Sequence, residues 1–335
     1  MVNMVRNFFI HLSNNVFLNK QAKKWGFFLG ADKFIAGTTI QNVSKAVKQL
    51  NTTGISCTLD NLGEFVLDKT EANKAKEKIL SLLEAIEQEN MDCHLSVKLT
   101  QLGLDIDQDY CISNMIEILD LAKKYNIFVN IDMEDYAHYE QTLTILKYLR
   151  KNYTNVGTVI QAYLYRSEDD LMDLKDVRIR LVKGAYKEDA KVAFQNQQEI
   201  DDNFLRLCKK RLLDGAFTSF ATHDHHIIDE LKNFVKENNL DQDHFEFQML
   251  YGFRNDLQSK LAKEGYHFCT YIPFGDDWFG YFMRRLAERP QNLNLVIKDA
   301  FYTDNNRLKK RPVITSLFIV CFATICCIKA RRRKS

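Results

Sequence analysis

The sequence predicts an α/β fold, a distorted parallel (β/α)8 or TIM barrel, and three observations lead to this class. Eight short apolar, β-prone runs alternate with amphipathic helical stretches. No long Pro-, Gly- or Ser-rich linker interrupts residues 39–302, which are therefore expected to form one domain. No G-x-G-x-x-G motif follows any run, which disfavours an open dinucleotide-binding sheet. Eight repeats fit a closed barrel better than an open sheet, which usually has fewer strands.

The expected strands are rich in β-branched and aromatic residues and are bounded by polar or glycine-containing junctions. In order, they are residues 55–59, 95–99, 128–132, 158–164, 179–183, 217–222, 245–250 and 267–272. Helical spacing of apolar residues predicts helices at 72–89, 114–125, 142–151, a weaker one after Ser167, then 201–213, 227–237, 256–264 and about 277–288. The last helix is expected to end before Pro290, because proline cannot continue a helix.

Both ends of the chain are expected to lie outside the barrel. Residues 1–38 are predicted to form an N-terminal helical segment, and residues 303–335 a basic tail. Within the tail, residues 313–328 are uncharged and are a candidate membrane anchor. As a helix they would span about 24 Å, short of the roughly 30 Å hydrocarbon core, so a buried terminal helix is an equal alternative.

The formal net charge of +2 at pH 7 combines two unlike parts of the chain. Residues 303–335 hold nine of the 46 Lys and Arg residues and one of the 44 Asp and Glu residues, a balance of +8. The remaining 37 basic and 43 acidic residues give residues 1–302 a balance of −6. An acidic main body lacks the clustered basic face that nucleic acid requires, so no nucleic-acid partner is expected.

Cysteine usage and the amino terminus indicate the compartment. The eight cysteines are scattered and do not form the dense framework of a small secreted domain. The first residues contain no apolar core of signal-peptide length. A cytoplasmic protein is expected, with the inner face of the cell membrane as a candidate attachment site for the tail.

Polar residues stand at the carboxyl ends of the predicted strands, where the active sites of such barrels lie. Lys98 lies in an apolar strand, and a buried ammonium requires a counter-charge or an anionic ligand. Asp132 on the next strand is a candidate for that partner. Any one such residue is more often an ordinary solvated or ion-paired group, but the repetition favours a site. The other members are Gln161, Arg180, Lys183, Thr222, His223, Gln248 and Tyr271.

The last predicted helix carries a polar stripe. Tyr281, Arg284, Arg285 and Glu288 are spaced to share one helical face. The aromatic and glycine-rich segment before them favours a packed cap over a solvated helix, and paired guanidinium groups suit a carboxylate or phosphate. The histidines at 223, 225 and 226 have no matching ligand pair elsewhere, so no metal is predicted.

Seven segments, taken together, carry a family resemblance. They are Ser-Val-Lys-Leu-Thr (96–100), Asp132, Gln161, Arg-Leu-Val-Lys-Gly-Ala-Tyr (180–186), Ala-Thr-His-Asp (221–224), Phe-Glu-Phe-Gln-Met-Leu-Tyr-Gly (245–252), and Tyr-x-Pro-x-Gly with Tyr-x-x-Arg-Arg-Leu-x-Glu (271–288). Over about residues 39–290 the chain closely resembles proline dehydrogenase. The resemblance implies a distorted flavin-binding barrel with N-terminal helices and a final helix over the barrel mouth.

The resemblance also implies an activity. The family oxidises L-proline to 1-pyrroline-5-carboxylate by hydride transfer from ring carbon C5 to N5 of FAD, and a quinone receives the electrons. This is the first step of proline degradation to glutamate. The chain resembles the bacterial monofunctional form, so the downstream 1-pyrroline-5-carboxylate dehydrogenase is expected to be a separate protein.

Family roles are carried over by position. Arg284, Arg285 and Lys98 would hold the substrate carboxylate, and Leu250, Tyr271 and Tyr281 would wall the proline ring. Asp132 and Arg180 are the expected catalytic residues, with Asp132 orienting the cations and Arg180 lying near the flavin. The expected FAD contacts are Met133, Gln161, Arg180, Lys183, Gly184, Ala185, Thr222, His223, Gln248 and Glu288.

The sequence departs from the family pattern in three places. Asp224 stands where many relatives have Asn, at an expected adenine contact. The first strand and residues 1–38 carry no matching motif, and the apolar basic tail is not part of the pattern. Two other functions remain open from the residues alone. One is a Schiff-base lyase or aldolase that uses Lys98, and the other is a membrane-tethered amino-acid binding protein.

Overall fold

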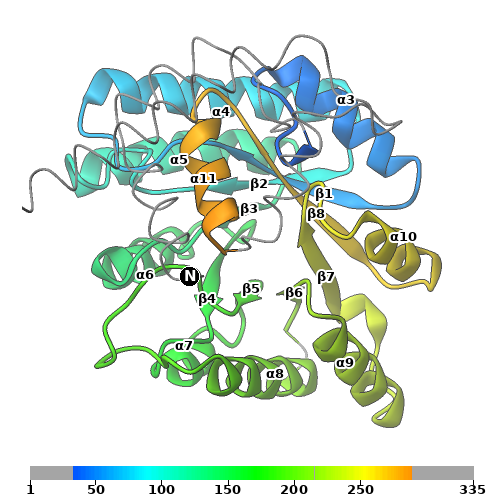
Figure 1. Cartoon of the computed structure of the whole chain (residues 1–335). Helices are drawn as coiled ribbons and strands as arrows, with labels where there is room; N and C mark the ends of the chain where they lie inside the picture. Colours follow the sequence, from blue (N-terminus) through cyan, green and yellow to red (C-terminus); the bar gives the residue numbers. More distant parts are fainter. Residues whose placement is uncertain (1–32, 215, 289–335) are drawn as a thin grey trace, which may run out of the picture. The chain divides into compact units, whose positions relative to one another are not determined.

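Eight parallel strands close into a barrel in the order of the chain, and the first strand is hydrogen-bonded to the last. The computed structural model describes residues 33–214 and 216–288 (Figure 1). The strands are β1 (Ser56–Asn61), β2 (Cys93–Val97), β3 (Val129–Ile131), β4 (Val156–Gln161), β5 (Ile179–Val182), β6 (Thr218–Ala221), β7 (Phe245–Leu250) and β8 (Phe268–Phe274). The predicted (β/α)8 barrel is confirmed.

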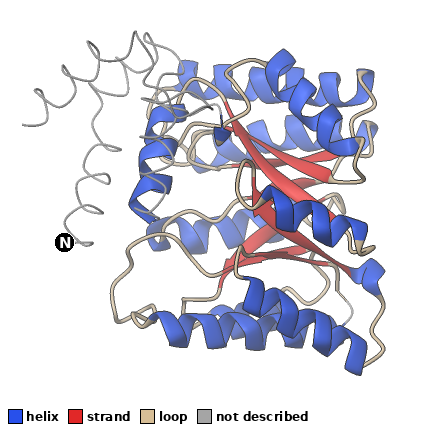
Figure 2. Ribbon diagram, turned by 45° about the vertical axis from the view of Figure 1, so that its right-hand side comes forward, coloured by secondary structure: helices blue, strands red, loops and turns tan. Residues whose placement is uncertain are grey.

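Helices alternate with the strands along the chain, and those of the barrel unit, α3 to α10, surround the strands (Figure 2). The helices are α3 (Ile40–Asn51), which precedes β1, then α4 (Lys69–Gln88), α5 (Gln108–Lys124), α6 (Tyr139–Leu149), α7 (Ser167–Asp173), α8 (Gln197–Asp214), α9 (His225–Glu237), α10 (Asn255–Lys263) and α11 (Trp278–Glu288). Two short 3₁₀ helices, η2 (Tyr136–His138) and η3 (Gln242–His244), precede α6 and β7. The weak helix predicted after Ser167 is the short α7.

Several helices begin earlier than the spacing of apolar residues predicts, and side-chain caps explain this at α4 and α5. The Asp68 carboxylate accepts hydrogen bonds from the backbone N–H groups of Thr70 and Glu71 at the start of α4, at 2.8 and 3.1 Å. At the start of α5, Asp107 accepts one from Tyr110 at 2.7 Å. These carboxylates satisfy N–H groups that have no partner within the helix. Each helix therefore starts at its cap, in a polar turn that precedes the apolar stripe.

The two faces of the strands differ in polarity. Cys57 and Leu59 of β1 belong to the hydrophobic core. Thr58 lies between them in the strand and points to the other face, where its hydroxyl is 2.9 Å from the Ser96 hydroxyl of β2. Asp60 follows on the same face and is 1% exposed. The apolar face packs beneath the helices, whereas buried polar side chains fill the barrel interior.

The chain divides into two compact units, and the barrel, Phe34–Asp276, is one of them. The described part of the other includes α11, in which the Trp278 and Phe282 rings lie 6.2 Å apart between centroids. None of the described helices combines the length and apolar character needed to cross a bilayer. The candidate anchor at 313–328 and most of the predicted N-terminal segment lie outside the described residues.

Candidate active site

Arg180 is the centre of a buried hydrogen-bond network inside the barrel. Its guanidinium donates to Gln248 Oε1 at 2.7 Å, to Asp132 Oδ1 at 2.6 Å and to Ser96 Oγ at 2.8 Å. It also lies over the Tyr271 ring, 5.1 Å from the centroid. One side chain from β5 thus contacts groups on or next to four other strands. Such a buried guanidinium is held in a single orientation, because several of its donors are satisfied.

Lys98 follows β2 and is paired with two carboxylates. Its Nζ lies 2.7 Å from Asp60 Oδ2 and 3.5 Å from Asp132 Oδ2. The expected pairing with Asp132 is confirmed, but Asp60 is the nearer partner. Burial by itself would lower the pKa of Lys98, whereas the charges of Asp60 and Asp132 outweigh it and raise that pKa. A lysine held as ammonium is a poor nucleophile, so this site disfavours the Schiff-base alternative.

Asp60 is the main residue of this network that the sequence analysis missed. It lies near the end of β1, the strand without a matching motif, and is almost fully buried. The signal that identified Lys98, a charged residue next to an apolar run, was also present at Asp60. Both buried carboxyl groups lie beside a cation: Asp60 is 2.7 Å from Lys98, and Asp132 is 2.6 Å from Arg180.

Tyr271 of β8 connects the two carboxylates. Its hydroxyl oxygen lies 2.6 Å from Asp60 Oδ2 and 2.9 Å from Asp132 Oδ2. Burial raises the pKa of Tyr271, so the phenol keeps its proton. Burial alone would also raise the pKa of Asp132, but Arg180 and then Lys98 outweigh it, and that pKa is lowered. Asp132 is therefore the ionised carboxylate between two cations.

Gln248 and Leu250, near the carboxyl end of β7, lie beside the network around Arg180 and Tyr271. Leu250 is paired in register with Tyr271 of β8, and its contact with a substrate stays a prediction. Gln248 accepts from Arg180 and donates to Glu246 Oε1 at 2.6 Å. The structure thus gathers the predicted residues Lys98, Asp132, Arg180, Gln248, Leu250 and Tyr271 at one end of the barrel.

Most of the expected cofactor residues lie on, or just after, the adjacent strands β4 to β7. Buried Gln161 donates to the backbone oxygen of Glu134 at 3.0 Å and, more weakly, to that of Met133 at 3.4 Å. Its own Oε1 has no donor among the described residues. Gly184 follows β5 with a positive φ of 113°.

The remaining cofactor candidates lie near the ends of β5 and β6. Lys183 Nζ pairs with Asp201 at 2.7 Å and Asp224 at 3.2 Å. Thr222 Oγ1 accepts from the Asp224 N–H at 3.2 Å, and His223 Nε2 accepts from the Leu250 N–H at 3.1 Å. Ala185 is exposed beside them. Asp224, the departure from the family pattern, therefore serves as a partner of Lys183.

The stripe on α11 belongs to the other compact unit. Tyr281 lies within this helix, and the side chains of Arg284, Arg285 and Glu288 lie outside what the structure describes. The placement of these four residues over the barrel mouth stays a prediction.

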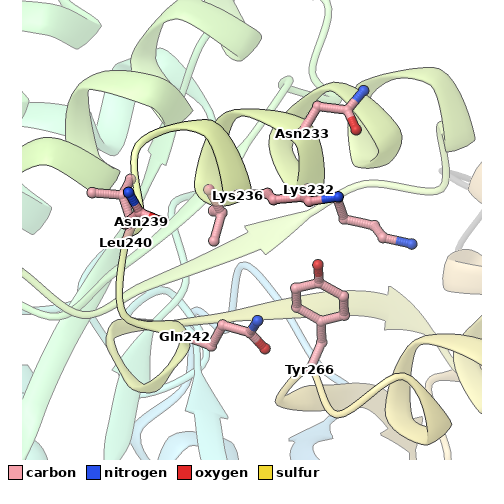
Figure 3. A pocket seen from close by; sticks show the side chains of 8 residues that line it. Lys232, Asn233, Lys236, Asn239, Leu240, Gln242 and Tyr266 are labelled. Atoms are coloured by element: carbon pink, nitrogen blue, oxygen red, sulfur yellow. The ribbon is translucent and has the colours of Figure 1, made fainter.

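Two polar features of the described barrel lie away from this network. A cavity of about 330 Å³ lies near the amino-terminal ends of β7 and β8 (Figure 3), lined by Lys232, Asn233, Val235, Lys236, Asn239, Leu240, Gln242 and Tyr266.

His94, Glu246 and Cys269 form a buried cluster whose potential ligand atoms lie within 4.8 Å of one another. The Arg178 guanidinium is 3.2 Å from Glu246. Burial is the main cause that lowers the pKa of His94, and the charge of Arg178 lowers it further. This cation disfavours a metal ion there.

Comparisons with known proteins agree with the geometry. A model of the proline dehydrogenase family matches residues 43–297. Proline dehydrogenase 1 of Bacillus subtilis subsp. natto is 47% identical over 297 residues, covering 88% of this chain and 98% of the relative. Proline dehydrogenase of Deinococcus radiodurans is 40% identical over 283 residues, covering 82% of this chain and 90% of the relative.

A solved structure is also similar. The proline utilization A (PutA) protein of Bdellovibrio bacteriovorus matches with a TM-score of 0.73 and 25% identity, over 83% of this chain. This chain spans only 34% of that larger protein. The family model and the two proline dehydrogenases together cover most of the chain. The chain therefore belongs to the proline dehydrogenase family of oxidoreductases.

Proposed function

We propose that this protein oxidises L-proline to 1-pyrroline-5-carboxylate, with FAD as cofactor and a quinone as electron acceptor. Membership of the family supports the reaction. The observation that carries the proposal is the buried network of Lys98, Asp132, Arg180 and Tyr271 at the strand ends. The network offers cations that can bind an anionic substrate, and an aromatic side chain that can pack against it. It contains no activated Ser or Cys nucleophile.

The substrate carboxylate is proposed to bind at Lys98. The ammonium is held between the carboxyl groups of Asp60 and Asp132, so little side-chain entropy is lost when an anion joins it. Arg284 and Arg285 are proposed to supply further donors from α11, and Leu250, Tyr271 and Tyr281 to wall the ring. The phenol of Tyr271 stays protonated and can hold no negative charge against the substrate.

The described residues fit FAD at the ends of β4 to β7. The buried Gln161 Oε1, without a donor among these residues, suits an N–H group of the flavin ring. Lys183 offers an ammonium for a diphosphate, although Asp201 and Asp224 compete for it. We propose that Met133, Gln161, Arg180, Lys183, Gly184, Ala185, Thr222, His223, Gln248 and Glu288 hold the cofactor.

Bound FAD supplies a two-electron acceptor, which no side chain of the protein provides. The chain's own residues position the reactants and set the local charge. Arg180 is held by Asp132 and Gln248, so its positive charge cannot turn away from the site. A fixed charge of this kind stabilises negative charge that develops beside it, without reorganisation during the reaction.

The visible spectrum tests cofactor, substrate and reaction together. The purified protein is expected to show flavin absorbance, and anaerobic L-proline should bleach it. A colourless protein, or a flavin spectrum that L-proline leaves unchanged, would contradict the proposal. The binding-protein alternative differs, since it predicts proline binding without bleaching.

Replacing Gly184 with alanine is expected to weaken flavin binding. A Cβ at this position would lie 2.3 Å from the Tyr163 ring, on a backbone whose φ of +113° L side chains rarely adopt. Backbone strain and overpacking together should destabilise this conformation of the loop by about 2 to 4 kcal/mol. Flavin release, followed by the rise in flavin fluorescence, measures the effect.

The matched control for this variant is Gly265→Ala. Gly265 also has a positive φ, +91°, but a Cβ there would meet nothing within 4 Å. It should cost only about 1 kcal/mol through backbone strain. Equal flavin retention in the two variants would mean that the close approach of Gly184 to Tyr163 does not shape the cofactor site.

The tail and the location belong to the same proposal. We propose a cytoplasmic protein whose basic tail, with the apolar stretch 313–328, brings the barrel to the inner face of the membrane where a quinone resides. The oxidation of 1-pyrroline-5-carboxylate is proposed to take place on a separate protein. Residues 39–302 are proposed as the catalytic domain, preceded by the N-terminal segment 1–38.

A further inference from the structure

The phenol of Tyr271 has one proton but contacts two carboxyl groups. Its oxygen is within hydrogen-bonding distance of both Asp60 Oδ2 and Asp132 Oδ2, at 2.6 and 2.9 Å. A phenol has one proton and can donate to only one of them. If both carboxyl groups were ionised, the second contact would join two acceptors without a proton. Inside a buried site this repulsion is weakly screened, which favours a proton on one of the two carboxyls.

The surroundings of the two carboxyls differ. Asp132 accepts from Arg180 at 2.6 Å and from Asn130 at 3.2 Å, and it lies 3.5 Å from Lys98. Asp60 has Lys98 as its only cationic partner among the described residues, at 2.7 Å. Its other oxygen, Oδ1, is buried and has no donor among those residues. A neutral carboxyl tolerates such a position better than a carboxylate does.

The pKa directions agree with this difference. Burial, the largest influence on Asp60, raises its pKa despite the opposing charge of Lys98. The pKa of Asp132 is lowered because Arg180 and Lys98 outweigh its burial. The proton therefore belongs on Asp60.

We propose that Asp60 is the protonated, neutral partner of ionised Asp132, and that it is a positioning residue for Lys98 and Tyr271. Asp60 donates to the Tyr271 oxygen, and Tyr271 donates to Asp132. With Asp60 neutral, the buried set of Lys98, Arg180 and Asp132 has a net charge of +1, which suits the carboxylate of the substrate. With both carboxyls ionised, the set would be neutral. This inference rests on the proposed function and identifies what holds its anion site ready.

Other titrating groups face the same region. Glu64 follows β1, and its charge contributes to the raised pKa of Lys98. Glu134 follows β3 and interacts electrostatically with Glu64 and with Lys98. Burial is the main cause that raises the pKa of Glu134 to about 7, so Glu134 can contribute to a pH profile. The variant Glu134→Gln removes this contribution, and the effect of Asp60 can then be measured on that background.

The test compares Asp60→Asn with Asp132→Asn in the flavin-loaded enzyme. Asparagine has the shape and charge of a protonated aspartate, so Asp60→Asn should keep the +1 charge. Apparent dissociation constants for L-proline come from anaerobic bleaching of the flavin at a series of pH values. In the wild-type protein, binding should weaken as the pH rises through the raised pKa of Asp60. Asp60→Asn should remove this dependence, on the Glu134→Gln background as well.

Asp132→Asn should be far more harmful at every pH. It leaves Arg180 and Lys98 without their shared carboxylate, and breaking a buried pair of this kind corresponds to about a 100-fold loss in proline affinity. Asp60→Asn should weaken binding at least about tenfold less than this. Equal losses in the two variants at all pH values, or a pH dependence that survives in Asp60→Asn, would overturn the proposal.

A matched control lies on the outer helices. Glu117 of α5 pairs with buried Lys76 of α4 at 2.7 Å, the same distance as Asp60 and Lys98. Glu117→Gln also removes one carboxylate from a lysine pair, but outside the site. It should leave the proline pH profile unchanged, and a changed profile would show that the effect of Asp60→Asn is general destabilisation.

Infrared spectroscopy observes the proton without turnover. The substrate-free holoenzyme, with isotope-labelled aspartate, should show the C=O band of a protonated carboxyl, and this band should disappear in Asp60→Asn. If that variant does not fold, the loss of the band with rising pH in the wild-type protein still tests the proton. Absence of any protonated aspartate band would overturn the proposal. Failure of the proposed function is distinct, because wild-type flavin would then not bleach with L-proline.

Discussion

Arg180→Met is expected to lower the free energy of unfolding by about 3 to 5 kcal/mol and to abolish bleaching by proline. The guanidinium satisfies Asp132, Gln248 and Ser96 at once, and all three are buried. Methionine has a similar length but offers no donors. It would leave the buried Asp132 carboxylate with Lys98, at 3.5 Å, as its one cation among the described residues, and the buried Gln248 amide oxygen without the Arg180 donor. Denaturant unfolding followed by circular dichroism measures the stability, and the flavin spectrum measures the activity.

The neighbouring Arg178 is the matched control. It lies two residues earlier in the chain, just before β5, donates to Glu246 at 3.2 Å, and packs between the Phe128 and Phe217 rings. Its side chain is 27% exposed, so water can replace part of what is lost. Arg178→Met should cost about 1 to 2 kcal/mol. If both variants lost the same stability and activity, the network around Arg180 would not be the special feature of the interior.

Lys98→Met is expected to raise the proline concentration needed for half-maximal bleaching by about 10- to 100-fold. A hydrogen bond to a charged group contributes about 1.5 to 3 kcal/mol, and each 1.4 kcal/mol corresponds to a factor of ten. Asp132 keeps its contact with Arg180 in this variant, so the barrel should still fold. Steady-state and stopped-flow measurements separate the effect on proline binding from the effect on the maximal rate.

Lys76→Met controls for the loss of a buried lysine. Lys76 is as buried as Lys98, at 7% exposure each, and its Glu117 partner is also at 2.7 Å. It lies on α4, outside the barrel interior, so its removal should change stability but not proline binding. A maximal rate that collapses in Lys98→Met at unchanged half-saturation would contradict the role of Lys98 in holding the substrate.

The order of the barrel elements could be predicted because it follows from local patterns. Apolar runs of strand length and amphipathic helical spacing are visible within a window of a few residues. The starts of α4 and α5 were placed too late because Asp68 and Asp107 cap them through side-chain hydrogen bonds ahead of the apolar stripe. The placement of the site at the strand ends was also predictable, because parallel strands in a closed barrel end at one face.

The pairing within the site could not be predicted in full. Lys98 was expected to pair with Asp132, and the distance of 3.5 Å supports this, but Asp60 is nearer at 2.7 Å. Asp60 contacts Tyr271 because closure of the barrel sets β1 beside β8, with Thr58 and Tyr271 in register. These residues lie far apart in the sequence, and no motif on β1 drew attention to Asp60.

The sequence by itself determined the fold class, the family resemblance and the identity of most charged residues at the strand ends. Its evidence is local: periodicity, motif residues, and charges next to apolar runs that require a partner. Only the tertiary structure decided which partners meet, that Arg180 joins groups from β2, β3, β7 and β8, and that two carboxyls share the proton-bearing contact with Tyr271. The physical reason is that hydrogen bonds and ion pairs depend on distances of a few ångströms, and closure of the barrel sets these distances.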